Sequence, residues 1–275
     1  MHQDAHAVLQ RLDRFVRDRI NPAIYIDSVP LSISAWQAPR EPVPFAEAIQ
    51  NSFEPVSLGW RFGRAWSTIW LRVTGEVPES WQKDSVADLA PEIQIDFGYN
   101  TSRSGFQAEA LAYDLSGKPI KAIAPKNSWL PWSINNKQID FYLEVAANPD
   151  VAGEYTFEPT SFGDWDTAPE TALYELKTLQ LSRRNVQVWE LAQDIWTIRG
   201  LISSLPQDSS RRHILIRAIE DMLDALDPAD VANSVASGRE KLKGVLSSPA
   251  APASHQIIAT GHAHIDSAWL WPIAA

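Results

Sequence analysis

The sequence predicts an α+β protein with an N-terminal helix and an antiparallel β-sandwich or jelly roll, then an antiparallel helical bundle and the first strand of a truncated β/α-barrel-type domain. Three observations predict this order. Apolar residues recur at helical spacing near the N-terminus, alternate with polar residues through the middle, and return to helical spacing further on. The expected boundaries are a helix over 1–27, a sandwich over 28–165, helices over 170–246, a linker over 247–254 and the last domain over 255–275.

The first element is an amphipathic helix. Its apolar positions recur at helical spacing, with charged residues between them: Val8, Leu12, Phe15 or Val16, and Ile20. The helix is expected to end at Asn21-Pro22, because a proline inside a helix removes a backbone hydrogen bond. The next segment, Ser28 to Phe53, is expected to be extended and irregular, since four prolines interrupt it: Pro30, Pro39, Pro42 and Pro44.

From about Val56 to Glu158 the apolar period is two, which indicates strands. The first run places apolar side chains on one face and the residues between them on the other: Ile69, Leu71 and Val73, against Trp66, Thr68, Trp70 and Arg72. Two further runs alternate in the same way: Ile93, Ile95 and Phe97, and Ile139, Phe141, Leu143 and Val145. Asp114 to Pro119 marks a turn. Short alternating strands separated by turns indicate an antiparallel sandwich or jelly roll.

Three helices are expected next. The first has one stripe of residues at helical spacing and is closed by Pro206: Trp189, Ala192, Trp196, Arg199 and Ile202. The second, capped by Ser209 or Ser210, and the third have apolar faces of their own: Leu215, Ile219, Met222 and Leu226, then Val231, Val235, Leu242 and Val245. Short connections indicate an antiparallel bundle. The strand expected around Ile257 to Thr260 should be poorly packed or exposed, because its barrel partners are not in the sequence.

Composition excludes several classes of partner. The 275 residues carry a formal net charge of −10, and nucleic-acid affinity depends on clustered Lys and Arg, so we expect no nucleic-acid partner. No uninterrupted apolar segment reaches the ~18 residues of a membrane span, and the N-terminus lacks the parts of a signal peptide. We therefore expect no membrane partner and a cytoplasmic location. The absence of cysteine excludes disulfides and closed thiolate zinc sites.

The strongest functional signal is Gly261-His262-Ala263-His264-Ile265-Asp266-Ser267-Ala268-Trp269-Leu270-Trp271-Pro272. Side chains alternate between faces along an extended segment, so His262, His264 and Asp266 are expected on one side. Imidazole nitrogen and carboxylate oxygen are ligand types that suit zinc and related divalent ions. The pattern predicts an open metal site, which leaves coordination positions for substrate.

Other metal hydrolases share the His-x-His pattern. One large class continues it as His-x-His-x-Asp-His, where this chain has Ser267 in place of the last histidine. Cyclic amidohydrolases place His-x-His at the end of their first barrel strand, and a purely structural pair of histidines is a further alternative. Three ligand-type residues at period two, preceded by Gly261, favour the metal site over the structural pair.

The longer string from Thr260 to Pro272 resembles the opening motif of the catalytic domain in the α-mannosidases of glycoside hydrolase family 38. The resemblance implies that His264 and Asp266 are zinc ligands and that Trp269 forms part of the wall beside the mannose ring. His262 matches a position that is not counted as a zinc ligand. In this family the zinc holds adjacent ring hydroxyls, so it orients and distorts the sugar rather than activating a water.

Two segments of the strand region, Gly63–Val73 and Phe141–Asn148, resemble more weakly the β-domain that precedes the catalytic domain in bacterial and fungal members. Together the resemblances imply the N-terminal portion of a zinc-dependent retaining α-mannosidase that hydrolyses terminal α-D-mannose residues from oligosaccharides. Its partner would be an α-mannoside oligosaccharide. The sequence leaves open the linkage that is cut and whether the intact enzyme is homo-oligomeric.

A retaining glycosidase needs two carboxyl groups about 5–5.5 Å apart. In the family these carboxyl groups and the remaining zinc ligands lie far downstream of the motif, so no catalytic residue is assigned in this chain. We therefore expect the isolated chain to be inactive and its zinc site to be incomplete.

The alternative function is a non-catalytic carbohydrate-binding or interaction module. The chain has 12 tryptophans, and sugar rings stack on aromatic side chains. The simpler interpretation, which we favour, is that Trp60, Trp66 and Trp70 fill the core of the sandwich or its contact with the helices, because large aromatic residues dominate protein cores.

Overall fold

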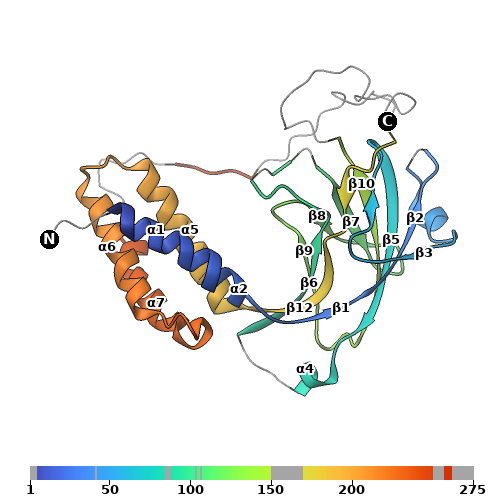
Figure 1. Cartoon of the computed structure of the whole chain (residues 1–275). Helices are drawn as coiled ribbons and strands as arrows, with labels where there is room; N and C mark the ends of the chain where they lie inside the picture. Colours follow the sequence, from blue (N-terminus) through green and yellow to red (C-terminus); the bar gives the residue numbers. More distant parts are fainter. Residues whose placement is uncertain are drawn as a thin grey trace. The chain divides into compact units, whose positions relative to one another are not determined.

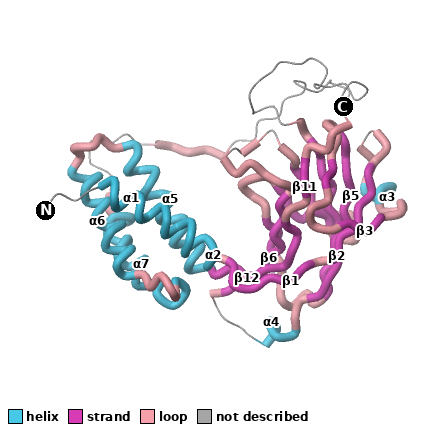
Figure 2. Tube along the Cα trace, viewed as in Figure 1, coloured by secondary structure: helices cyan, strands magenta, loops and turns pink. Residues whose placement is uncertain are grey.

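A computed structural model of the chain describes residues 5–40, 42–83, 88–102, 104–105, 107–149, 170–249 and 257–261. The described residues form two compact units (Figure 1). The helical unit contains those within Met1–Asp27, Val86–Ala90 and Arg183–Gly261, and the strand unit those within Ser28–Ser85 and Pro91–Ser182. The long helices belong to the first unit and most strands to the second (Figure 2).

The helical unit begins with α1 (Ala5–Phe15), which continues into a π-helical turn, η1 (Val16–Ile20), and α2 (Asn21–Ala23). Val8, Leu12 and Ile20 are buried, as predicted. The predicted end of the helix at Asn21-Pro22 is wrong, because Pro22 lies in the first turn of α2. The η1 turn widens the helix just before the proline, and the Asn21 N–H donates to the Val16 carbonyl five residues back.

Three longer helices complete this unit: α5 (Val186–Ser204), α6 (Ser210–Ala225) and α7 (Val231–Leu246). Asn185 caps α5 by accepting a hydrogen bond from the Val188 N–H at 3.0 Å, which satisfies one of the free donors of the first turn. Ser209 occupies the cap position of α6 but makes no side-chain cap hydrogen bond. The three helices and α1 share one apolar core, and the predicted faces of α6 and α7 are buried in it: Leu215, Ile219, Met222, Leu226, Val231, Val235 and Leu242.

The predicted stripe of α5 is only partly buried. Ile202 is buried and Ala192 packs against the core, but Trp189 and Trp196 are exposed, Trp196 to 76%. The rest of the buried face is formed by Val188, Leu191, Ile195 and Ile198. Both faces of α5 carry apolar residues at helical spacing, so the spacing does not distinguish the inner face from the outer one.

Arg239 of α7 links α7 to α5. Its guanidinium donates to Glu190 Oε2 at 2.5 Å, to Asp194 Oδ2 at 2.9 Å and to Gln187 Oε1 at 3.0 Å. Burial opposes the charge, but the hydrogen bond to Asp194 and the carboxylate charges raise the pKa of Arg239 above its usual value. The link therefore persists wherever both carboxylates are ionised.

Replacing Arg239 with methionine is expected to lower the free energy of unfolding by about 1–2 kcal/mol, because it leaves two partly buried carboxylates without their common donor. Urea denaturation followed by circular dichroism measures the loss. Arg17→Met is the matched control, since the pair of Arg17 with Asp18 is local and exposed. It should leave the unfolding midpoint unchanged, and equal losses in the two variants would contradict the linking role of Arg239.

The strand unit is built from two main sheets. The first has the strand order β1 (Tyr25–Pro30), β12 (Thr178–Asn185), β6 (Leu89–Asp96) and β9 (Trp129–Pro131). The second has the order β3 (Glu54–Val56), β2 (Ser32–Gln37), β5 (Ser67–Glu76), β10 (Gln138–Ala147), β7 (Glu109–Tyr113) and β8 (Pro119–Ile123). A small sheet pairs β11 (Tyr174–Glu175) with β4 (Arg61–Phe62), and two short helices complete the unit, α3 (Phe45–Ala48) and α4 (Glu79–Lys83).

Alternating residues of both main sheets form one core, as the period of two predicts. The predicted inner positions are all buried: Ile69, Leu71, Val73, Ile93, Ile95, Phe97, Ile139, Phe141, Leu143 and Val145. Every pairing whose register is described is antiparallel. The predicted sandwich is therefore confirmed for these strands.

Two expectations about where the strand region begins and ends in the sequence are wrong. The segment expected to be irregular contains the end of β1, all of β2 and the short helix α3. Pro30 is the last residue of β1 and the other prolines follow β2, so none interrupts a ladder. The region expected to be helical over 170–246 begins with β11 and β12. Leu179 and Leu181 of β12 alternate into the sandwich core.

The predicted turn between β7 and β8 is confirmed. The Asp114 carboxylate accepts from the Ser116 hydroxyl at 2.6 Å, the Ser116 N–H at 2.9 Å and the Lys118 N–H at 3.0 Å. The Ser116 side chain first, and then the Lys118 N–H, hold the pKa of Asp114 below its usual range. Folding therefore favours the ionised form of this carboxyl group.

A carboxyl group with a lowered folded-state pKa contributes stability that is present above its ordinary pKa and is lost as pH falls through the lowered value. We expect Asp114→Asn to be less sensitive than the parent to acidification from about pH 5 to pH 2, because the amide cannot gain a proton in this range. Melting temperatures measured across this range test the prediction. The matched control is Asp221→Asn, at an exposed position of α6, and an equal change of pH dependence in both variants, or no change in Asp114→Asn, would contradict the role of Asp114.

Candidate functional site

Residues 257–261, which lead to the predicted metal-binding motif, have irregular backbone. Ile257 is 88% exposed and Ile258 is 93% exposed, so the expected exposure of this segment is confirmed, although the described residues form no strand here. The predicted site residues His264, Asp266 and Trp269, together with His262, lie outside the residues that the structure describes.

No other metal centre competes with the motif in the described part of the chain. None of its groups of His, Asp and Glu brings together three side chains that could hold a metal ion. The donor set of His264 and Asp266, one imidazole nitrogen and one carboxylate, fits zinc by its chemistry. Two ligands alone should bind zinc more weakly than a complete set.

The two strand segments that carry the weaker resemblance lie side by side. β5 and β10 are neighbours at the centre of the six-stranded sheet and pair from Glu76 opposite Gln138 to Ser67 opposite Ala147. Their inward side chains lie in the core between the sheets. The resemblance of these segments is therefore explained by packing at the centre of the sheet.

The turn that enters β5 is held in a narrow space. Gly63 has a φ of +83°, and a Cβ at this position would lie 2.7 Å from the Cβ of Ala147. Only glycine fits both the left-handed backbone and the close approach. Trp66 also has a positive φ, of 69°, and its N–H donates to the Ala147 carbonyl at 2.9 Å. The end of β10 thus fixes the path of the chain into β5.

A buried polar network closes the same end of the β5–β10 pair. The Gln107 side chain accepts from the Asn100 N–H at 2.6 Å and donates to the Asn100 carbonyl at 3.1 Å. The Asn148 side chain donates to the Gln107 carbonyl at 3.1 Å, and the Tyr174 hydroxyl donates to the Asn148 carbonyl. Neither Gln107 nor Tyr174 has a signal in the sequence, because a single polar residue beside a strand shows no periodicity. These bonds join loops to one another, which indicates a structural role.

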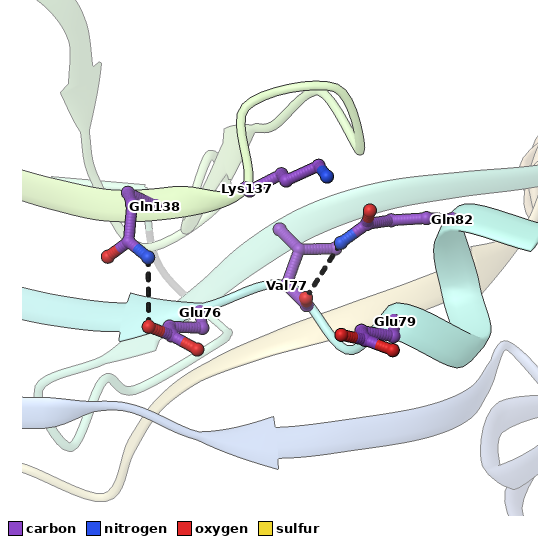
Figure 3. Close-up of a pocket in the computed structure, with 6 residues that line it drawn as sticks. All are labelled: Glu76, Val77, Glu79, Gln82, Lys137 and Gln138. Atoms are coloured by element: carbon purple, nitrogen blue, oxygen red, sulfur yellow. Dashed lines mark hydrogen bonds between the residues drawn. The ribbon is translucent and has the colours of Figure 1, made fainter.

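An open cleft of about 510 Å³ lies at the other end of the β5–β10 pair (Figure 3). Its lining is Glu76, Val77, Glu79, Gln82, Lys137 and Gln138. The Gln138 side chain donates to Glu76 Oε1 at 2.8 Å, and the Gln82 side chain donates to the Val77 carbonyl at 3.2 Å. Carboxylates, amides and an ammonium group can hydrogen-bond to sugar hydroxyls, but this lining offers no aromatic ring for stacking.

Two of the three tryptophans considered for sugar binding are packed. Trp70 is fully buried, and its ring centroid lies 6.0 Å from that of Phe45 and 5.5 Å from that of Tyr113. Trp60 stacks on Phe62 at 5.0 Å and is partly buried against the main core. A packing role is confirmed for both, but only Trp60 packs against the sandwich core, whereas Trp70 lies in a separate cluster with Phe45 of α3. Trp66 is half-buried.

None of the described helices combines the length and the apolarity that a bilayer crossing needs. The fold itself agrees with known proteins, because the family model "Alpha-mannosidase, jelly roll domain" matches residues 29–182. These residues include most of both main sheets.

Individual relatives match over nearly the whole chain. Alpha-mannosidase 2C1 of Homo sapiens is 25% identical over 284 residues, which cover 96% of this chain and 24% of the relative. Alpha-mannosidase G of Dictyostelium discoideum is 22% identical over 279 residues, which cover 98% of this chain and 24% of the relative. Alpha-mannosidase of Saccharomyces cerevisiae is 24% identical over 241 residues, which cover 81% of this chain and 20% of the relative.

The chain spans about a quarter of the length of the first two of these relatives. The similarity includes the sandwich, whose strands and core are described above, and extends beyond it. The chain therefore belongs to the family of proteins with the α-mannosidase jelly-roll domain.

Proposed function

We propose that the chain is the N-terminal portion of a zinc-dependent retaining α-mannosidase that hydrolyses terminal α-D-mannose residues from oligosaccharides. One observation carries the proposal: the α-mannosidase jelly-roll match over residues 29–182 occurs in the same chain as the motif from Gly261 to Pro272. The sandwich and the helices would then support a catalytic domain and shape the entrance to its active site.

In this proposal His264 and Asp266 hold zinc, and Trp269 forms part of the wall beside the mannose ring. When bound, zinc would supply an orienting interaction with adjacent ring hydroxyls. The ligands must be a neutral imidazole and an ionised carboxylate, so zinc binding should weaken in mildly acidic solution. No carboxylate of this chain is assigned as nucleophile or acid/base.

Zinc binding by the 275-residue chain tests the metal assignment. We expect weak zinc binding in equilibrium dialysis, and its loss in the His264→Ala/Asp266→Ala double variant, because that variant removes both assigned ligands. The matched control is His6→Ala/His213→Ala, which removes two exposed histidines outside the motif and should bind zinc like the parent. Equal binding by the parent and the motif variant would overturn the assignment.

Hydrolysis of an aryl α-mannoside, with added zinc and with a chelator, tests the catalytic part of the proposal. We expect no turnover, since both carboxyl groups of the retaining mechanism are unassigned in this chain. Zinc-dependent turnover that disappears in the motif variant would show that the chain supplies these groups itself. That result would contradict the proposal that no carboxylate of this chain acts as nucleophile or acid/base.

The second candidate function is a carbohydrate-binding module, and the cleft in Figure 3 is the observation that favours it. A module of this kind should bind methyl α-mannoside without zinc, and Lys137→Ala/Gln138→Ala should abolish that binding by removing two hydrogen-bonding groups. Titration calorimetry distinguishes the two functions. Binding that requires zinc and is lost in Trp269→Ala would reject the module.

A further inference from the structure

One face of α5 is exposed and uncharged. It consists of residues that share a side of the helix, here called the α5 stripe: Trp189, Gln193, Trp196, Thr197, Gly200, Ser203 and Ser204. Trp196 is 76% exposed and Trp189 is 39% exposed. A helical stripe of this length extends about 22 Å along the axis. Exposed aromatic residues on a surface without charges are typical of the core of a protein interface.

The charged residues of α5 lie outside the stripe and are bound within the helical unit. Glu190 and Asp194 accept hydrogen bonds from Arg239 of α7. Arg199 pairs with Asp13 of α1 at 2.8 Å. The opposite face of α5 fills the core of the bundle. The stripe is thus the side of α5 that the bundle does not use.

The stripe is complementary in shape to itself. Trp196 lies at its midpoint, seven residues from Trp189 and seven residues from Ser203. A two-fold axis at Trp196 sets two α5 helices antiparallel and places each Trp189 opposite Gly200 and Ser203 of the other copy. A large side chain then faces small ones, which is how the ridges of one helix fill the grooves of another.

The ends of the helix are complementary in charge about the same axis. Arg184 precedes α5, with its guanidinium 4.6 Å from the centroid of the Trp189 ring. The exposed Asp208 follows the C-terminal end of α5. In the antiparallel pair, Arg184 of one copy approaches Asp208 and the negative end of the helix dipole of the other. The stripe itself contains no charged residue, so the pairing sets no like charges against each other within it.

We propose that the α5 stripe is a homodimer interface, in which two copies of this chain pack their α5 helices antiparallel about a two-fold axis at Trp196. The inference depends on the helical unit alone and requires that a catalytic domain supported by the helices leaves this stripe uncovered. Trp196 is its central contact, and Trp189 is the side chain that enters the small-residue half of the partner's stripe.

Sedimentation equilibrium of the full chain at about 1–100 µM tests the interface. The parent should show a concentration-dependent dimer. Trp196→Glu should raise the dimer Kd by at least about 30-fold, because it removes a central aromatic residue and sets two carboxylates against each other. The matched control is Ile214→Glu, at a 58% exposed position of α6, which should keep the parental Kd. Circular dichroism should be unchanged in both variants, since both side chains are exposed.

A mixing experiment tests the position of the axis. Trp196→Lys should be as monomeric as Trp196→Glu, but an equimolar mixture of the two should dimerise, because opposite charges then meet across the axis. A parent that stays monomeric, or a dimer that Trp196→Glu leaves intact, would overturn the interface. A mixture that stays monomeric would overturn the axis at Trp196.

Discussion

Trp70→Ala is expected to lower the free energy of unfolding by about 3–5 kcal/mol. Trp70 is fully buried in a small cluster on the outer face of the six-stranded sheet, where Phe45 of α3 and Tyr113 of β7 pack against it. β5 pairs on both edges, with β2 and β10, so its backbone cannot move to close the cavity left by the ring. Urea denaturation followed by circular dichroism measures the loss.

Two further variants separate burial from other effects of the substitution. The indole N–H of Trp70 has no hydrogen-bond partner among the described residues, so Trp70→Phe loses no hydrogen bond and should cost only about 1–2 kcal/mol. Leu115→Ala, at a 56% exposed turn position, should change stability by less than about 0.5 kcal/mol. If Trp70→Ala were as stable as Leu115→Ala, Trp70 would not be a packing residue, and a sugar-binding role would regain support.

Gly63→Ala is expected to lower the free energy of unfolding by about 2–5 kcal/mol. The left-handed backbone at Gly63 disfavours any Cβ by about 1–2 kcal/mol. The added Cβ would also meet the Cβ of Ala147 at 2.7 Å and a ring carbon of Tyr174 at 3.2 Å, and such overpacking typically costs about 1–3 kcal/mol. Urea denaturation measures the sum of the two effects.

The matched control for this variant is Gly59→Ala. Gly59 has a φ of +89°, but nothing lies within 4 Å of the position of its Cβ, so only the backbone cost of about 1–2 kcal/mol should remain. Ala147→Gly in the Gly63→Ala background should recover part of the difference by removing the closest atom. Equal losses in Gly63→Ala and Gly59→Ala would show that the close approach of the turn to β10 is unimportant.

The functional site is predictable from the sequence only as a set of ligand types. The motif supplies imidazole and carboxylate groups at strand spacing, and the resemblance assigns roles to His264, Asp266 and Trp269. Their geometry depends on backbone outside the described residues. The cleft beside Glu76 and Gln138 had no sequence signal, because these residues meet only through the register of β5 with β10.

The strands β2 and β12, near the two ends of the strand region in the sequence, were also not predictable from the apolar pattern. β2 is short and contains two serines, and the last three residues of β12 are polar, so neither shows a strong apolar period. They are strands because β5 and β6 provide neighbours whose backbone groups need partners. Prolines beside β2 suggested an irregular segment, but a proline outside a ladder does not prevent its formation.

The sequence was enough to predict which side chains of β5, β6 and β10 face the core between the sheets, because their aliphatic residues and Phe alternate onto one of the two faces of each strand. Which face of α5 is buried depends instead on how the helices pack together. Both faces carry apolar residues at helical spacing, and the core shared with α1, α6 and α7 accepts Leu191, Ile195 and Ile198. Trp189 and Trp196 stay outside, because burial of one side of a helix exposes the side opposite to it.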